Sequence, residues 1–309
     1  MAVDLERFNR IIDISFESNN NGAMAPGEFV RPTSIICPRR GRKPTIEING
    51  TFTTKNYMPT FNLTIKNLYL DLQGKQYSKI KIKAGYENQL TTIEGTILTM
   101  YQEQPGPEGR TVIQCMYGNV QEWLDAMVEL QFDKGAMLSD VLYALKSKLK
   151  AKDVKVGKKA GGLTLKEPLQ FTGTARQALD ELKKRFEEER LLLFIRGTII
   201  CAICLVKEDD KENPEPDKIE TAKLQYMSAP PQENTGDEAG AYYTTITAPW
   251  MPELSIGDIL EIPARVYIRN FGTVGGAAKT QKIQVTALSF HFGTTGTTNS
   301  MTVQGFMVR

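Results

Sequence analysis

The chain has 309 residues, of which 41% are hydrophobic and 24% charged, enough for two or three domains with sizeable cores. A net charge of +2 favours no class of partner, and the first residues lack the apolar core of a signal peptide. The longest apolar run, residues 191–206, is interrupted by Arg196 and Gly197 and is too short to span a bilayer. We expect no stable membrane insertion, and assembly in a cytoplasm.

Residues 1–118 alternate apolar and polar side chains with a period of two, which is typical of half-buried strands. A turn-rich cluster at 104–109 predicts a hairpin within this region. Strands are predicted over residues 12–16, 46–52, 61–72, 77–86, 91–102 and 111–118. We therefore expect short strands separated by loops over residues 1–60 and a continuous antiparallel meander over residues 61–118.

The period becomes helical after residue 119. One helix is predicted from the spacing of Trp123, Met127 and Leu130, a second over 137–149 and a third over 174–189. The third begins with a capping-box sequence formed by Thr174 and Gln177. The runs 191–195 and 199–206 then predict a hairpin that turns at Arg196 and Gly197. Residues 119–206 are thus predicted to form a small α+β middle domain.

Residues 207–240 are rich in charged residues and proline, which predicts an exposed connector or extended arm with one short strand over 219–227. Strands resume over 254–270, 280–292 and 300–308. Between Ile283 and Phe292 the apolar residues shift parity, which predicts a β-bulge in that strand.

The sequence offers little chemistry. Its one histidine, His291, lies between two phenylalanines on a predicted strand, and no motif for nucleophilic, phosphate-binding or zinc chemistry is present. Cys201 and Cys204 have CxxC spacing, but residues three apart on a strand point to opposite faces, and no second ligand pair exists. We predict buried cysteines, an outward-pointing histidine, and no catalytic, cofactor-binding or metal-binding residues, hence no enzyme.

Two segments are strongly basic: 31–43 has five basic residues and 146–159 has seven lysines. A positive surface binds phosphates without sequence preference, but 146–159 has no aromatic residue on which bases would stack. A solvated helix end and loop is the favoured interpretation of 146–159. Nucleic acid and an acidic protein partner stay open.

Several short motifs resemble the baseplate hub proteins of phage tails, the late control protein D-like family, which is related to the hub part of contractile injection systems. The motifs are FNLTIKNL from residue 61, KIKIKAGY ending at Gly85 and Tyr86, TTIEGTI containing Gly95, VIQCMYG, and LSIGDILEI containing Gly257 and Asp258. The resemblance covers most of residues 45–309. We expect a positive φ at Gly85 and a bulge or close backbone approach at Gly95.

This resemblance implies an α+β, mainly β fold. Two tail-tube-like antiparallel β-barrel domains, 1–118 and 241–309, would flank the middle domain 119–206 and the connector 207–240. It implies a homotrimer whose six barrels form a ring that adapts a six-fold tail tube to a three-fold central spike. The implied partners are the tail tube or a tube-initiator protein, a separate spike protein and other baseplate proteins, with DNA only as passing cargo. The implied location is the virion tail baseplate, after assembly in the host cytoplasm.

Two other classes of function stay open. One is a wall-degrading enzyme at the tail tip, which a murein-cleavage assay of the pure chain would reveal. The other is a non-viral β-barrel nucleic-acid-binding module, which would show a steeply salt-dependent affinity for DNA.

Overall fold

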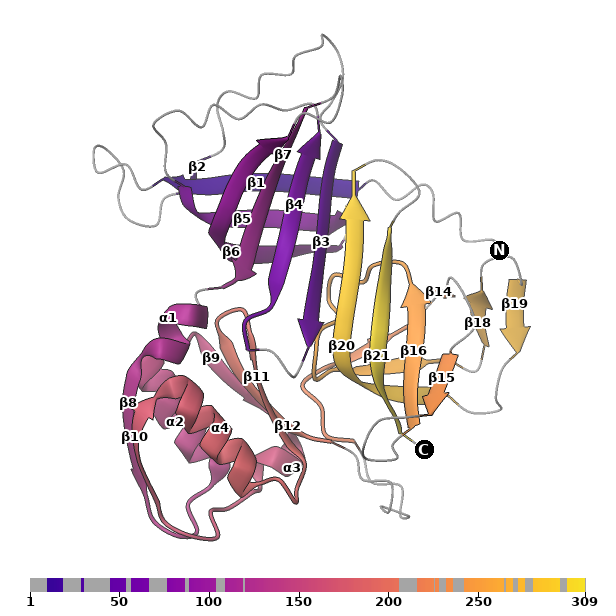
Figure 1. Cartoon of the computed structure of the whole chain (residues 1–309). Coiled ribbons are helices and arrows are strands. Elements are labelled where there is room, and N and C mark those ends of the chain that lie inside the picture. Colours follow the sequence, from indigo (N-terminus) through magenta and orange to yellow (C-terminus); the bar gives the residue numbers. More distant parts are fainter. Residues whose placement is uncertain are drawn as a thin grey trace.

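The computed structural model confirms the predicted fold class: the chain is mainly β, with a small α+β middle domain between two strand blocks (Figure 1). The described residues are 10–18, 29–30, 45–53, 57–66, 77–86, 89–103, 109–118, 120–205, 216–224, 226–227, 232–235, 242–263, 265–268, 272–275, 280–294 and 299–308. The basic segment 31–43 and the turn cluster 104–108 lie outside them.

The two strand blocks share one 13-stranded sheet, which the sequence did not predict. The N-terminal block consists of β1 (Arg10–Ser18), β2 (Phe29–Val30), β3 (Thr45–Thr53), β4 (Thr60–Lys66), β5 (Tyr77–Tyr86), β6 (Gln89–Glu103) and β7 (Arg110–Tyr117). The C-terminal block consists of β13 (Thr221–Lys223), β14 (Tyr226–Met227), β15 (Gln232–Thr235), β16 (Tyr242–Ala248), β17 (Ile259–Ile262), β18 (Arg265–Ile268), β19 (Gly272–Gly275), β20 (Gln281–Gly293) and β21 (Ser300–Val308). The sheet runs β15-β16-β21-β20-β3-β4-β7-β6-β5-β1-β2, with β17 and β13 attached beside β20, while β14, β18 and β19 form a small separate sheet.

The blocks join through β3 and β20, which pair antiparallel from Thr53 and Ala287 to Glu47 and Gly293. In Figure 1 the N-terminal block curls, so that β1 and β5 cross β3 and β4 at a steep angle, whereas β20 runs beside β3. The predicted bulge in β20 is confirmed, because its pairing with β21 shifts between Val285 and Ala287. Beyond the bulge, β20 pairs with β17 instead of β3.

One apolar core lies under both blocks. The ring of Phe290 stacks on Phe52 with centroids 5.6 Å apart, and on Trp250 at 5.2 Å. Gly50 makes room for this ring, since a β-carbon there would lie 2.9 Å from it. The continuous core holds the two blocks together along the β3–β20 pair.

The middle domain has a second core. It consists of α1 (Val120–Asp125), β8 (Met127–Phe132), α2 (Leu138–Leu149), β9 (Asp153–Val156), α3 (Lys158–Gly161), β10 (Leu169–Thr174), α4 (Ala175–Arg185), β11 (Leu191–Arg196) and β12 (Ile199–Cys204). Helices α2 and α4 lie between the β8–β10 pair and the β11-β12-β9 sheet (Figure 1). Of the helices that the structure describes, none has the length and apolar character needed to cross a membrane.

Local signals in the middle domain predicted α2, α4 and the β11–β12 hairpin, but not β8, β9, α3 or β10. The capping box is confirmed: the backbone N–H of Gln177 donates to Oγ1 of Thr174 at 3.3 Å, and the N–H of Thr174 donates to Oε1 of Gln177 at 2.9 Å. The prediction that Met127 and Leu130 continue a helix is wrong, because these residues belong to β8. Met127 is 71% exposed whereas Val128 and Leu130 are buried, so burial in this segment alternates with a period of two. The spacing of the three apolar residues used for the prediction was too little to distinguish a strand from a helix.

The described part of the predicted connector is not an exposed arm. Asp217 and Leu224 are buried, and β13 pairs in parallel with β17. The short strand expected over 219–227 is present as β13 and β14. The reason is that this segment supplies hydrogen bonds that join the middle domain to the C-terminal block. Residues 206–215 lie outside the described residues.

Candidate functional site

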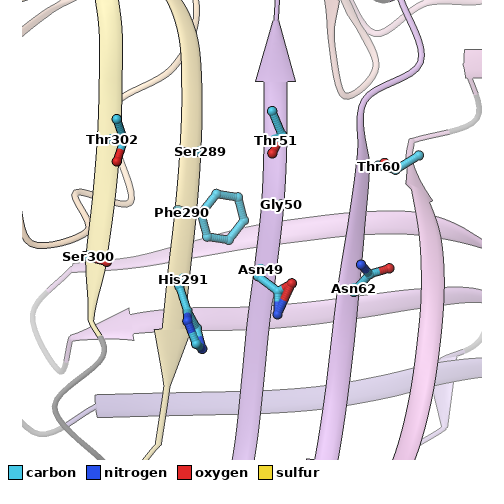
Figure 2. Close-up of a pocket in the computed structure, with 10 residues that line it drawn as sticks. All are labelled: Asn49, Gly50, Thr51, Thr60, Asn62, Ser289, Phe290, His291, Ser300 and Thr302. Atoms are coloured by element: carbon cyan, nitrogen blue, oxygen red, sulfur yellow. The ribbon is translucent and has the colours of Figure 1, made fainter. Parts of the chain in front are cut away.

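A polar depression of about 340 Å³ crosses β21, β20, β3 and β4 on the outer face of the joined sheet (Figure 2). It exists because the β3–β20 pairing places the polar positions of both blocks side by side. Its lining is Asn49, Gly50, Thr51, Thr60, Asn62, Ser289, Phe290, His291, Ser300 and Thr302. None of these ten described residues is Asp, Glu, Lys or Arg, so the depression offers hydroxyl and amide groups but no fixed charge.

His291 lies in this depression, on the outer face as predicted. Its side chain is 36% exposed, and its Nε2 lies 4.0 Å from a carboxylate oxygen of Glu47. The same Glu47 forms an ion pair with Lys66 at 2.6 Å. Within the described residues Nε2 of His291 has no hydrogen-bond partner, so this nitrogen is not bonded to a serine or cysteine as in a nucleophile–base pair.

The neighbouring outer face over β1, β5 and β6 is charged instead. Lys79 lies 3.6 Å from Glu17, and Lys81 lies 2.8 Å from Glu94, both across adjacent strands. Partly exposed pairs of this kind contribute little to stability. One sheet therefore carries a neutral polar face and a charged face in different places.

The N-terminal motif residues lie away from the depression. Gly85 has a φ of 145° near the end of β5. The hydroxyl of Tyr86 accepts a hydrogen bond from Nδ2 of Asn299 at 2.6 Å, and its ring packs edge-on against Phe292 at 5.8 Å. Tyr86 thus connects the two blocks. Gly95, in β6, is buried where a β-carbon would meet the neighbouring strand and a core ring.

Gly257 and Asp258 lie together just before β17, at the contact with the middle domain. Gly257 has a φ of +83°, and a side chain there would clash with an aromatic ring of the middle domain. Asp258 is only 1% exposed. It accepts hydrogen bonds from the N–H of Ser255 at 2.9 Å and of Glu220 at 3.2 Å, and it pairs with Arg196 at 3.3 Å. Burial raises the pKa of Asp258 to about 6, although Arg196 favours the charged form.

This raised pKa predicts how stability depends on pH. The folded protein holds the Asp258 proton more tightly than the unfolded chain, whose carboxyl titrates near 3.8. The group therefore stabilises the fold in acid, and this contribution is lost as the pH rises from about 4 through about 6. A shift of this size corresponds to roughly 3 kcal/mol. We expect the difference in the free energy of urea unfolding between the wild type and Asp258→Asn to change with pH by up to this amount. A difference that does not depend on pH would contradict the assignment.

Two buried polar residues at the same contact, Asp217 and Gln284, were not predicted from the sequence. Asp217 is 3% exposed, and its carboxylate accepts hydrogen bonds from the N–H groups of Lys159 and Ala160, both at 3.0 Å, and of Cys204 at 2.9 Å. Nε2 of Gln284 donates to the carbonyl oxygens of Cys204 at 2.9 Å and Asp217 at 2.7 Å. The one available signal was Gln284 itself, a polar residue inside an apolar strand.

The cysteines do not form a site. Cys201 packs in a small cluster with Phe194 and Ile256, whereas Cys204 packs in the core of the middle domain, so their opposite orientation is confirmed. Burial raises the pKa of Cys201 to about 12, which keeps it a thiol. Among the residues that the structure describes, no group of three or more His, Cys, Asp or Glu is placed to hold a metal ion.

The basic segment 146–159 forms the end of α2, then β9 and α3. Lys146 pairs with Asp153 at 3.5 Å, and Lys155 pairs with Glu220. The backbone of Lys159 is bound by Asp217. Several of these lysines therefore make contacts within the chain, in agreement with a solvated structural surface.

Comparison with known proteins identifies the fold. No protein-family model and no curated protein matches the sequence. Two solved structures are similar along nearly their whole length: the tail protein from Neisseria meningitidis MC58, with a TM-score of 0.56, 8% identity and 97% of each chain covered, and the prophage MuSo2 tail protein from Shewanella oneidensis, with a TM-score of 0.53, 9% identity and 96% of each chain covered. The resemblance predicted from the short motifs is thereby confirmed for the fold: this chain has the fold of phage tail proteins.

Proposed function

We propose that the chain is a structural protein of a phage tail and forms the baseplate hub, a homotrimeric ring that adapts a six-fold tail tube to a three-fold central spike. The observation that carries the proposal is the full-length similarity to tail proteins. The two curled strand blocks joined in one sheet support it, because three chains with two such blocks each present six related units. The partners are the tube or its initiator, a spike protein and other baseplate proteins, in the virion.

The neutral polar face fits a passage for DNA. A wall rich in lysine or arginine would retain DNA by releasing counterions, with a steep dependence on salt. The depression across β20 and β3 offers hydroxyl and amide groups without such charges. We assign this face to the inside of the ring, where DNA is cargo and not a ligand, which disfavours a nucleic-acid-binding module.

The number of copies per ring tests the proposal. We expect a mass of three chains in solution at micromolar concentration, or three copies per ring when the chain is imaged in an assembled tail. A chain that is monomeric in the assembled particle, or a ring with six copies, would overturn the hub assignment.

Exposed apolar side chains on β6 are the proposed ring contact. Leu98 is 50% exposed at the position where the β6–β7 register shifts, and Tyr101 is 40% exposed. Exposed apolar groups gathered on one strand favour burial by a neighbour. We expect Leu98→Glu combined with Tyr101→Glu to abolish the trimer while the chain stays folded. The control is Tyr143→Glu, on α2, where the side chain is 52% exposed; an equal effect of both variants would reject β6 as the contact.

We propose no catalytic role. The only imidazole is that of His291; its Nε2 lies 4.0 Å from Glu47 and has no hydrogen-bonded nucleophile among the described residues. The pure chain is expected to leave peptidoglycan intact. Cleavage that disappears in His291→Ala would restore the wall-degrading alternative.

A further inference from the structure

The tip of the β11–β12 hairpin, residues 196–198, touches both strand blocks; we refer to it as the hairpin tip. On one side it meets the end of β7 by direct backbone contact. A β-carbon on Gly118 would lie 2.6 Å from the carbonyl oxygen of Gly197, and a β-carbon on Gly197 would lie 3.3 Å from the ring of Tyr117. Only two glycines allow the N-terminal block and the hairpin tip to approach this closely.

On its other side the hairpin tip is bound to the C-terminal block. Nη1 of Arg196 lies 3.3 Å and 3.5 Å from the two carboxylate oxygens of Asp258, and Nη2 donates to the carbonyl oxygen of Glu253 at 3.3 Å. The carboxylate is buried while the Arg196 side chain is 21% exposed. Charge-assisted hydrogen bonds of this kind hold a defined geometry.

The hairpin tip lies where the β3–β20 ladder ends. The last pair of that ladder is Thr53 and Ala287. Just beyond it, the N–H of Val285 donates to the carbonyl oxygen of Asp258 at 2.9 Å. The ring of Phe52, next to Thr53, contacts the ring of Tyr117 at 5.1 Å. The residues that the hairpin tip touches on either side therefore flank the point where the two blocks separate.

The opposite end of the ladder is closed by contacts between the blocks themselves. Tyr86 is hydrogen-bonded to Asn299, and Nη1 of Arg10 donates to the carbonyl oxygen of Gly293 at 3.3 Å. The N–H of Ile46 donates to Oγ1 of Thr294 at 3.0 Å. At the end near Thr53 the middle domain takes the corresponding position between the blocks.

We propose that the hairpin tip is a wedge that fixes the angle between the two strand blocks, with the Arg196–Asp258 ion pair as its fastening. A strand pair by itself twists, and a bulge bends it further, so the β3–β20 ladder does not define one angle. A buried ion pair adds little net stability, but it penalises any arrangement that leaves one of its charges unpaired. The proposed role of the hairpin tip does not depend on the hub assignment. Its consequence for ring closure rests on the proposed function, because a closed ring requires the same angle between the blocks in all three chains.

The test measures the distance between the blocks. Spin labels are attached at Thr92→Cys and Thr280→Cys, both at exposed positions, in a chain that also carries Cys37→Ser. The labelled protein is diluted with an excess of unlabelled protein, so that the measured distances come only from label pairs within one chain. The wild type is expected to give a narrow distance distribution. Arg196→Met should widen it roughly two-fold, because the twisting ladder loses one support. The control is Arg185→Met, whose guanidinium pairs with Glu181 within α4 at 2.8 Å, and it should leave the width unchanged.

An unchanged width in Arg196→Met, or equal widening in Arg185→Met, overturns the wedge. If Arg196→Met does not fold, Asp258→Asn decides with the same labels, since the amide keeps the shape and one acceptor; an unchanged width in that variant also overturns it. The mass in solution is read separately. A chain that is monomeric in the assembled particle, and whose distribution still widens in Arg196→Met, would retain the wedge and reject the hub.

Discussion

Replacing Gly95 with valine is expected to destabilise the N-terminal block by about 3 kcal/mol, the upper part of the range for overpacked sites. A β-carbon at this position would lie 2.7 Å from the carbonyl oxygen of Met116 and 2.8 Å from the ring of Phe61. Neither neighbour has room to move, because the first is strand backbone and the second is 1% exposed. Urea unfolding followed by circular dichroism, together with the soluble yield, measures the loss.

The matched control is Gly162→Val. Gly162 is exposed at the end of α3, and the nearest atom to a β-carbon there is the carbonyl oxygen of Lys159 at 3.5 Å. Its unfolding midpoint should change little, as surface substitutions usually do. Similar midpoints for both variants would show that β6 shifts to accept a side chain, and the structural role of Gly95 would be rejected.

Replacing Asp217 with alanine is expected to cost about 4 kcal/mol, because it removes the carboxylate that accepts from three backbone N–H groups, two of them buried. These groups belong to Lys159, Ala160 and Cys204, on two elements of the middle domain. Gly157 lies directly against the Asp217 carboxylate, and it has no side chain that could replace the lost acceptor. Denaturant unfolding monitored by fluorescence and circular dichroism gives the difference.

Two further variants serve as controls for Asp217→Ala. Asp217→Asn keeps one oxygen acceptor and should lose less stability than Asp217→Ala. Glu188→Ala removes a carboxylate that pairs with Lys166 on the surface, where the side chain is 83% exposed, and it should be nearly neutral. If Asp217→Ala were as stable as Glu188→Ala, water would have to satisfy the three N–H groups, and the connector would not hold the domains together.

The sequence by itself determined the features that depend on neighbours along the chain. Alternation of apolar residues predicted most strands of the N-terminal block and, in the C-terminal block, β17, β20 and β21, because successive side chains on a strand point to opposite faces. The parity shift in residues 283–292 predicted a bulge in this strand, and the structure places it between Val285 and Ala287. The capping box at Thr174 follows from contacts three residues apart. The short stretch after α1 was misassigned because three apolar residues fitted two periods, and β9, α3, β10 and β16 were not predicted.

Only the tertiary structure decided how the blocks meet and where polar groups are buried. The β3–β20 pairing uses backbone groups, which every residue except proline carries, so side-chain patterns do not encode it. Asp217 stands in a charged, proline-rich segment and Asp258 in a predicted strand. The burial of both depends on partners far along the chain, as with Arg196, 62 residues from Asp258. A charged side chain is buried only where the fold supplies its hydrogen bonds, and no local sequence pattern predicts such partners. The neutral polar face has the same origin, because its two halves come from strands that only the fold brings together.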